Sequence, residues 1–151
     1  MATTPQERLA ALGLSLPARN KPLGKYLPYK LVGNMLYVSG SSADPRVYGA
    51  VPASSAEYEG PGQVTVEEAV EAARSTCLRI LGIAELAVGS INNIKRVVKS
   101  LGMVNAPAGF TEHPRIIDGY STLLEDVFGP EDGVGLDFQH GFIQHLKTTQ
   151  A

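Results

Sequence analysis

The chain has 151 residues, of which 44% are hydrophobic and 19% charged, as is typical of one soluble globular domain. Fifteen acidic against thirteen basic residues give a formal charge of −2, so nucleic-acid binding through a general basic field is not expected. The single cysteine excludes an intrachain disulfide, and no apolar run approaches the roughly 20 residues of a membrane-spanning helix.

The N-terminal segment predicts a short helix followed by an ordered arm. Thr4 is a suitable N-cap residue, Pro5 suits the first helical position and Gly13 ends the pattern. No basic stretch precedes an apolar core here, so we expect no secretory signal. We expect a cytoplasmic protein. A mitochondrial location is the alternative, although Met1–Leu12 carries one arginine and one glutamate and would make a poor transit helix.

Two aromatic and β-branched runs, Tyr26–Val32 and Met35–Ser39, predict a β-hairpin. Glycine and asparagine at positions 33 and 34 separate them, and both residue types tolerate the positive φ that a tight hairpin turn requires. Ser41–Gly62 is rich in Ser, Pro, Gly and Ala and predicts a loop, within which Val47–Val51 predicts a short edge strand.

The clearest predicted element is a long amphipathic helix. Thr65 and Glu68 form a T-x-x-E capping box at its start. Apolar residues then recur at steps of three and four as far as Val88, and Gly89 suits the C-terminal cap. Cys77 lies on the apolar stripe, so we expect a buried, unreactive thiol.

The rest of the chain predicts a strand, a second helix and a weak final pattern. Ile94–Val104 is rich in β-branched residues and predicts a strand. Pro114–Phe128 predicts a helix that Gly129 closes. Leu136–Leu146 alternates only partly and Lys147–Ala151 predicts a frayed tail.

Generic catalytic and metal-binding motifs are absent from the sequence. His140 and His145 are five residues apart, a spacing that places them on one face of neither a helix nor a strand, and His113 fits a loop or helix-start role. We therefore predict no metal site. The basic residues Lys95, Arg96 and Lys99 fit a solvated strand edge, with an anion-binding patch as the alternative.

Five segments together resemble the RidA/YjgF/UK114-type family, in the branch often called YjgF/chorismate-mutase-like or endoribonuclease L-PSP. No single segment is decisive, but all five occur in the family's order. They are Lys21–Tyr26, Val32–Gly40, Val64–Ala69, Ile94–Lys99 and Gly109–Pro114.

This resemblance implies an α+β fold in which a single mixed sheet is backed by two helices, as in chorismate-mutase-like proteins. It also implies a homotrimer that binds small molecules in clefts between subunits and needs no cofactor. Well-studied relatives hydrolyse reactive enamines and imines of the 2-aminoacrylate type to 2-oxo acids and ammonia. Other members have been described as ribonucleases, which the charge of −2 disfavours here.

The resemblance also implies which residues contact the ligand. Tyr26 falls at the family's pocket tyrosine, and Ser39 with Gly40 falls at its pocket-lining Ser-Gly pair. Phe110 is expected at the pocket mouth. Asp118 is close to the family's frequent helix asparagine, so that contact would be changed. No catalytic residue is assigned.

The C-terminal part departs from the family pattern. The family places its carboxylate-binding arginine in the strand after the second helix and a glutamate on the last strand, yet the segment 135–142 contains neither residue. We therefore divide the chain into a family-like domain, 1–135, and a divergent tail, 136–151, with the final strands missing or altered. A mis-joined or truncated reading frame and a natural variant that lost the hydrolase site both remain open. The missing arginine argues against deaminase activity, and a non-catalytic metabolite-binding or scaffold trimer is the alternative.

Overall fold

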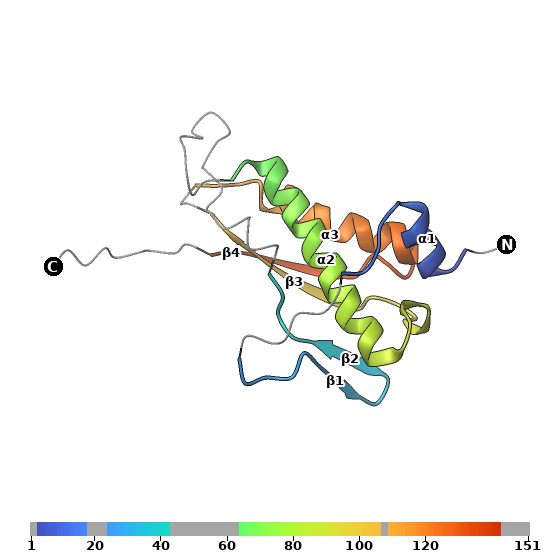
Figure 1. Cartoon of the computed structure of the whole chain (residues 1–151). Helices are drawn as coiled ribbons and strands as arrows, with labels where there is room; N and C mark the ends of the chain where they lie inside the picture. Colours follow the sequence, from blue (N-terminus) through green and yellow to red (C-terminus); the bar gives the residue numbers. More distant parts are fainter. Residues whose placement is uncertain (1–2, 18–23, 43–63, 107–108, 143–151) are drawn as a thin grey trace.

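The structure is a computed structural model that describes residues 3–17, 24–42, 64–106 and 109–142 (Figure 1). Within these ranges three α-helices, one 3₁₀ helix and four strands follow one another along the chain. In order, they are α1 (Pro5–Ala11), β1 (Tyr29–Val32), β2 (Met35–Val38), α2 (Val66–Val88), η2 (Ile91–Asn93), β3 (Lys99–Asn105), α3 (His113–Phe128) and β4 (Leu136–Phe142). The predicted strand 47–51 lies outside the described residues.

The two long helices form the centre of the molecule. They pack against each other, the β1–β2 hairpin packs against α2, and β3 with β4 packs against α3 (Figure 1). The short α1 lies against α3 and η2. This arrangement confirms the α+β class. None of the described helices combines the length and apolarity that a membrane crossing would require.

The strands pair in two different ways. β1 and β2 are antiparallel, with Gly33 at φ +56° in the connecting turn, which confirms the predicted hairpin. β3 and β4 are parallel from the Lys99–Leu136 pair onward, because α3 connects them as a crossover. We expected a single mixed sheet. Within the described residues the strands form two separate two-stranded sheets, and no ladder joins them.

The predicted strand 94–104 begins later than its β-branched composition suggested. The Ile94 N–H donates to the Ile91 carbonyl at 3.1 Å and closes η2. The Val97 N–H donates to the Asp132 carbonyl at 2.7 Å, in the turn after α3. These backbone groups are thus committed to other segments, and ladder pairing starts only at Lys99.

Local capping signals set the helix ends. Thr65 Oγ1 accepts from the Glu68 N–H at 3.1 Å, and Glu68 Oε2 accepts from the Thr65 N–H at 2.8 Å. Gly89 ends α2 in the left-handed conformation at φ +82°. Thr4 forms the same kind of box with Glu7 at α1. The predicted starts and ends of these two helices are confirmed.

The core consists of two clusters of buried side chains. One lies among α1, η2 and the C-terminal halves of α2 and α3, and it contains Leu9, Cys77, Leu81, Ile91, Leu123, Leu124, Val127 and Phe128. The other lies near the start of both long helices, and it contains Val66, Ala69, Val104, Ala106, Phe110, Ile116 and Ile117. Each long helix therefore contributes apolar residues to both clusters.

The structure places a strand, β4, at the start of the segment that we expected to be a divergent tail. β4 covers seven residues and pairs with β3 along the whole length of β3. Whether residues 136–151 form a unit apart from the rest of the chain stays a prediction. The weak alternation of this segment did not reveal a strand, because its backbone ladder depends on β3, more than thirty residues earlier.

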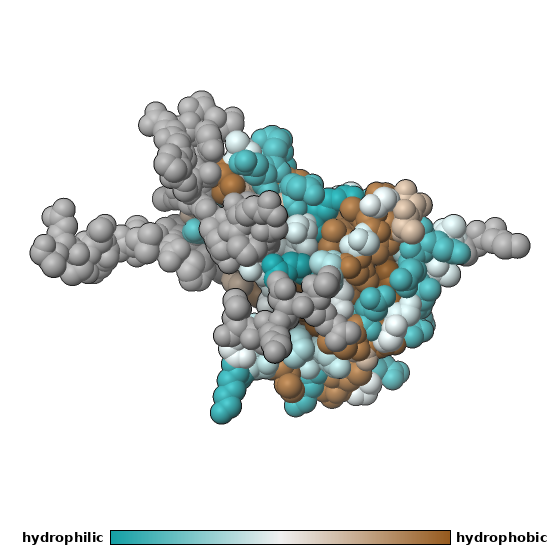
Figure 2. Space-filling view, in the orientation of Figure 1, coloured by the Kyte–Doolittle hydropathy of each residue, from teal (hydrophilic) through white to brown (hydrophobic). Residues whose placement is uncertain are grey.

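Large apolar side chains remain exposed on both sheets. On β3, Leu101 and Met103 are more than 60% exposed, and Leu136 of β4 is exposed to a similar degree. On the hairpin, Val32 and Tyr37 are more than half exposed. In Figure 2, the largest apolar patch on the visible face lies beside α1, and smaller patches lie lower down, over the region of the hairpin.

Candidate functional site

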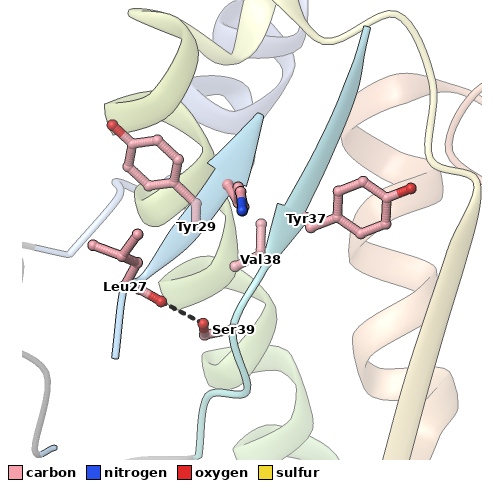
Figure 3. Close-up of a pocket in the computed structure, with 6 residues that line it drawn as sticks. Leu27, Tyr29, Tyr37, Val38 and Ser39 are labelled. Atoms are coloured by element: carbon pink, nitrogen blue, oxygen red, sulfur yellow. Dashed lines mark hydrogen bonds between the residues drawn. The ribbon is translucent and has the colours of Figure 1, made fainter. Parts of the chain in front are cut away.

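The open end of the β1–β2 hairpin forms a shallow hollow of about 300 Å³ (Figure 3). Its wall combines apolar, phenolic, hydroxyl and cationic side chains, which are Leu27, Tyr29, Lys30, Tyr37, Val38 and Ser39. Leu27 and Tyr37 are 70% and 57% exposed. One chain therefore provides an open surface and not an enclosed cavity.

Strand register decides which of these side chains share a face. Tyr29 pairs with Val38, and Lys30 pairs with Tyr37. Paired residues in an antiparallel ladder point to the same side, so Lys30 and Tyr37 lie together on the more exposed face. Tyr29 and Tyr37 extend to opposite sides of the hairpin (Figure 3).

Ser39 continues this pairing one step beyond β2. Its N–H donates to the Pro28 carbonyl at 2.9 Å, which keeps the chain extended. Its hydroxyl donates to the Leu27 carbonyl at 2.5 Å (Figure 3). The Ser39 hydroxyl proton is thus already donated to the Leu27 carbonyl, while the lone pairs of the hydroxyl oxygen can accept a hydrogen bond from a ligand.

The charge of the hairpin segment is positive. Residues 24–42 contain Lys25 and Lys30 and no aspartate or glutamate. Among the described ion pairs, none involves either lysine. A small anion would therefore meet a favourable local field at the hollow, although solvent and salt would screen it.

Three of the residues predicted to bind ligand are close together in the sequence around the hollow. Ser39 lines it. Gly40 follows directly, and an added Cβ there would meet no atom within 4 Å. Tyr26 is 51% exposed and precedes Leu27, but it is not among the six lining residues. The ligand-binding roles of all three stay predictions.

The other two predicted residues lie elsewhere in the single chain. Phe110 is only 6% exposed and belongs to the core cluster with Ile116 and Ile117. Its ring meets the His113 ring edge-on, with 4.9 Å between centroids. Asp118 is exposed on α3. Neither lines the hairpin hollow, and their expected position at a cleft between subunits stays a prediction.

Sequence reasoning missed the cation and the phenols of the hollow. The sequence pattern predicts Tyr29, Lys30 and Tyr37 as strand residues and assigns them no role in binding. A usable signal was present, because a 19-residue segment with two lysines, three tyrosines and no acidic residue is unlike the rest of the chain. The pairing of Lys30 with Tyr37 also follows from the two-residue turn.

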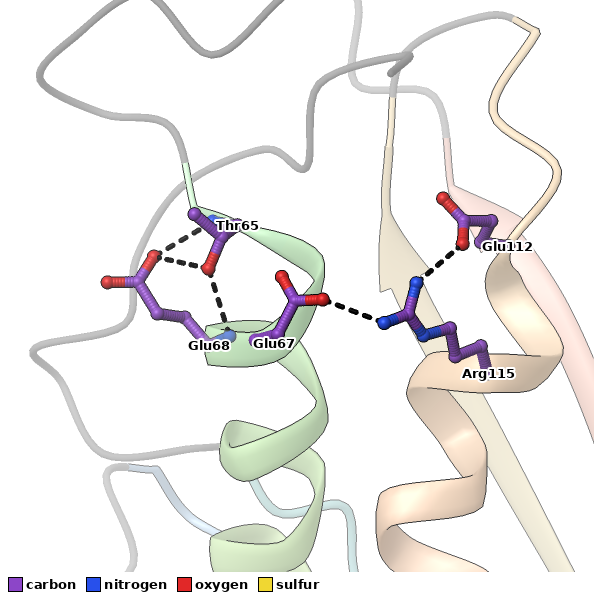
Figure 4. A network of polar contacts seen from close by, with 5 residues as sticks. All are labelled: Thr65, Glu67, Glu68, Glu112 and Arg115. Carbon is purple, nitrogen blue, oxygen red and sulfur yellow. Dashed lines mark hydrogen bonds and ion pairs between the residues drawn. The ribbon is translucent and has the colours of Figure 1, made fainter. Parts of the chain in front are cut away.

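A polar network joins the starts of the two long helices (Figure 4). Arg115 Nη2 lies 2.7 Å from Glu67 Oε1, and Arg115 Nη1 lies 2.9 Å from Glu112 Oε1. The hydrogen bond that Arg115 donates to Glu112, followed by the charge of Glu67, raises the pKa of Arg115. These side chains are roughly half exposed, and their ion pairs link the start of α2 to the start of α3. None of them is among the residues that line the hollow.

The remaining candidate groups do not form a reactive site. Burial raises the pKa of the Cys77 thiol to about 12, which confirms the expected unreactive environment. Arg96 Nη2 lies 3.2 Å from Asp132 Oδ1, as an ion pair without hydrogen-bond geometry. The described residues contain no group of three or more histidine, cysteine or acidic side chains that could hold a metal ion.

Comparison with known proteins agrees with this architecture. A family model described as "YjgF/chorismate_mutase-like, putative endoribonuclease" matches residues 6–136. Protein TCP17 of Trypanosoma cruzi is 34% identical over 125 residues, which cover 83% of this chain and 75% of that protein.

Two crystal structures share the fold. A protein from Shewanella oneidensis MR-1, described as a putative endoribonuclease, has a TM-score of 0.79 and 32% identity, covering 93% of this chain and 89% of that one. The protein Atu1372 from Agrobacterium tumefaciens, described as having unknown function, has a TM-score of 0.76 and 30% identity, with 95% and 84% covered.

Proposed function

The chain belongs to the YjgF/chorismate-mutase-like family, and from that premise we propose that it handles small metabolites by binding a short carboxylate-bearing molecule in the hairpin hollow. The observation that carries this proposal is the hollow itself, which combines Lys30, Tyr37 and Ser39 with apolar walls. A few polar groups set among apolar side chains are typical of small-molecule sites.

We also propose that a second subunit completes the hollow in a homotrimer. The exposed walls at Leu27 and Tyr37 support this, because a small ligand is normally buried over most of its surface. The apolar side chains of Leu101 and Met103 support it further, since exposed apolar surface on a sheet is typical of a protein interface.

Binding without turnover is the function that the geometry supports best. Imine hydrolysis needs an acid or base to activate water, and the described residues that line the hollow include no carboxylate or histidine. After Glu131 the sequence contains neither glutamate nor arginine. We therefore expect the hollow to bind a 2-oxo or 2-imino acid without hydrolysing it, because the hollow lacks the groups that the resemblance assigns to hydrolysis.

The binding proposal is tested by thermal unfolding with a panel of 2-oxo and amino acids. Ligands that bind only the folded state raise the melting temperature as their concentration passes the dissociation constant. We expect a rise with at least one short 2-oxo acid and no change with its neutral amide. A panel without any shift at millimolar concentration would exclude the proposal.

Imine hydrolysis is the second candidate, favoured by the position of Ser39 in the hollow. Water adds to the imine carbon, and the C–N bond then breaks to release ammonia and a 2-oxo acid. The test generates a 2-imino acid with an amino-acid oxidase and follows its disappearance with micromolar protein. Acceleration above buffer that Ser39→Ala abolishes would establish it, whereas a rate equal to buffer would leave binding as the function.

A further inference from the structure

We propose that Lys30 is the residue that binds the ligand's carboxylate, in place of the arginine missing from the C-terminal segment. This inference rests on the proposed function of the hollow. Lys30 lines the hollow together with Ser39, on the strand that pairs with β2. Among the described lining residues, no other side chain is cationic.

Three polar groups converge on one face of the hairpin. Lys30 is opposite Tyr37, where cross-strand Cβ atoms are about 4.5–5.5 Å apart. Ser39 lies two residues after Tyr37 in a chain kept extended by its bond to Pro28, so alternation places it on the same side. By strand register an ammonium group, a phenol and a hydroxyl therefore share one face of the hairpin, with the Tyr37 ring extending away from Ser39 (Figure 3).

The ammonium group of Lys30 is available for a ligand. Among the described residues it has no ion pair or hydrogen bond, and the segment 24–42 contains no acidic side chain to compete with a bound anion. A carboxylate arriving there would form a charge-assisted hydrogen bond.

The hydrogen-bonding capacity of the face further defines the ligand. Because the Ser39 hydroxyl already donates to Leu27, it can offer a ligand only acceptor capacity, which suits an N–H group. Val38 and Leu27 are the aliphatic residues of the lining, and alternation along the strand places Val38 on the other face, with Tyr29. The combination fits a short aliphatic acid with a nitrogen next to its carboxylate, that is, a 2-amino or 2-imino acid, and the related 2-oxo acid would bind through the carboxylate alone.

A lysine in this position predicts a different selectivity from an arginine. The guanidinium group binds a carboxylate through two parallel hydrogen bonds, whereas the ammonium group acts as a point charge. We therefore expect the site to accept carboxylates of varied geometry and to lose affinity as ionic strength rises.

The test measures dissociation constants for pyruvate, alanine and the neutral pyruvamide by ligand-observed NMR on the full chain. Lys30→Gln removes the charge, Lys30→Arg retains it, and Lys25→Gln is the matched control because Lys25 is exposed on the same segment but does not line the hollow. We expect Lys30→Gln to weaken pyruvate binding about tenfold, as for a lost hydrogen bond to a charged group. Lys25→Gln should stay within about twofold, the range expected for a surface charge outside the contact. Lys30→Arg keeps a charged donor and should bind pyruvate more tightly than Lys30→Gln does.

The outcomes separate this inference from the proposed function. If the wild-type chain binds pyruvate but Lys30→Gln and Lys25→Gln behave alike, the role of Lys30 is wrong and the metabolite site stands. If pyruvamide binds as tightly as pyruvate, the role of Lys30 is also wrong and the metabolite site stands. If the wild-type chain binds none of the three probes at tens of millimolar, both proposals fail. Alanine binding more tightly than pyruvate, with the excess lost in Ser39→Ala, would support the acceptor role of Ser39.

Discussion

Cys77 shows how burial decides the chemistry of one residue. Its side chain is fully buried in the core cluster beside Leu81 and Leu123. Removal from water disfavours the thiolate and raises the pKa to about 12, although the charge of Arg74 opposes the shift. At neutral pH the residue therefore behaves as a small apolar side chain.

We predict that Cys77 does not react with a disulfide reagent at pH 8 while the chain is folded. Reaction should appear only at the rate of unfolding and should reach one thiol per chain in denaturant, because the sequence has a single cysteine. Fast labelling of the native chain, measured by absorbance, would contradict the burial of this thiol.

The same pKa shift predicts how stability depends on pH. Between pH 9.0, the ordinary pKa of a cysteine thiol, and about pH 12, the unfolded chain loses the thiol proton while the folded chain keeps it. Its contribution to stability is therefore complete below pH 9 and falls above it by about 1.4 kcal/mol per pH unit.

Gly119 lies where α3 packs tightly against α2. An added Cβ would lie 2.3 Å from the Val70 carbonyl oxygen and 2.9 Å from Val70 Cγ1. The backbone of α2 cannot move away as a flexible side chain could, so the absence of a side chain at 119 permits this packing distance.

We predict that Gly119→Ala lowers the free energy of unfolding by about 1–3 kcal/mol, the usual cost of overpacking. Without a clash, alanine in place of glycine would raise the stability of a helix by up to about 1 kcal/mol. A fall in the free energy of unfolding would therefore indicate the clash with Val70. Denaturant unfolding provides the measurement. Gly40→Ala is the control, because its Cβ would meet nothing within 4 Å. Equal stability of the two variants would contradict the close packing.

At the scale of elements, α2 depends on its capping box as well as on its apolar stripe. Thr65 and Glu68 satisfy each other's backbone N–H groups at the start of the helix (Figure 4). Close by, Arg115 ties the first turn of α2 to α3 through Glu67. The start of α2 thus fixes a local helix end and an interhelical contact.

We predict that Thr65→Ala costs about 0.5–2 kcal/mol of stability, since an unsatisfied N-terminal N–H group replaces a capped one. Thr65→Ser should retain most of the stability because it keeps the hydroxyl. Thr122→Ala makes the same chemical change on the exposed side of α3 and should alter stability by no more than about 0.5 kcal/mol. Circular dichroism during thermal unfolding compares the three variants.

At the scale of the whole molecule, one chain leaves much apolar surface uncovered. The exposed residues of β3 and β4 and those of the hairpin belong to different sheets. Association of several copies is the simplest way to cover both surfaces, because apolar area removed from water stabilises an assembly. The shallow hollow would become an enclosed site in the same step.

We predict a solution mass of about 48 kDa, three times the 16.0 kDa of one chain, by light scattering coupled to size-exclusion chromatography. Leu101→Lys should shift the mass toward the monomer, because a charge would replace an exposed apolar side chain on β3. Thr122→Lys, a charge on the exposed side of α3, is the control and should leave the mass unchanged. A wild-type mass of 16 kDa would exclude the trimer.

Elements whose signals are local can be predicted from the order of amino acids alone. The capping box at Thr65, the glycine at 89 and the two-residue turn at 33–34 act within a few residues of one another, so helix ends and the hairpin could be predicted. The apolar stripe also predicted the burial of Cys77. Ser39 was the part of the hollow that family resemblance indicated.

Other features depend on residues that are far away along the chain, and these features became visible only in the three-dimensional structure. β3 begins at Lys99 because the turn after α3 takes the Val97 N–H, and β4 is a strand because β3 is available to pair with it. Phe110 is buried by residues from α2, β3 and α3. Burial and ladder pairing result from contacts between segments far apart along the chain, and periodicity within one segment carries no information about them.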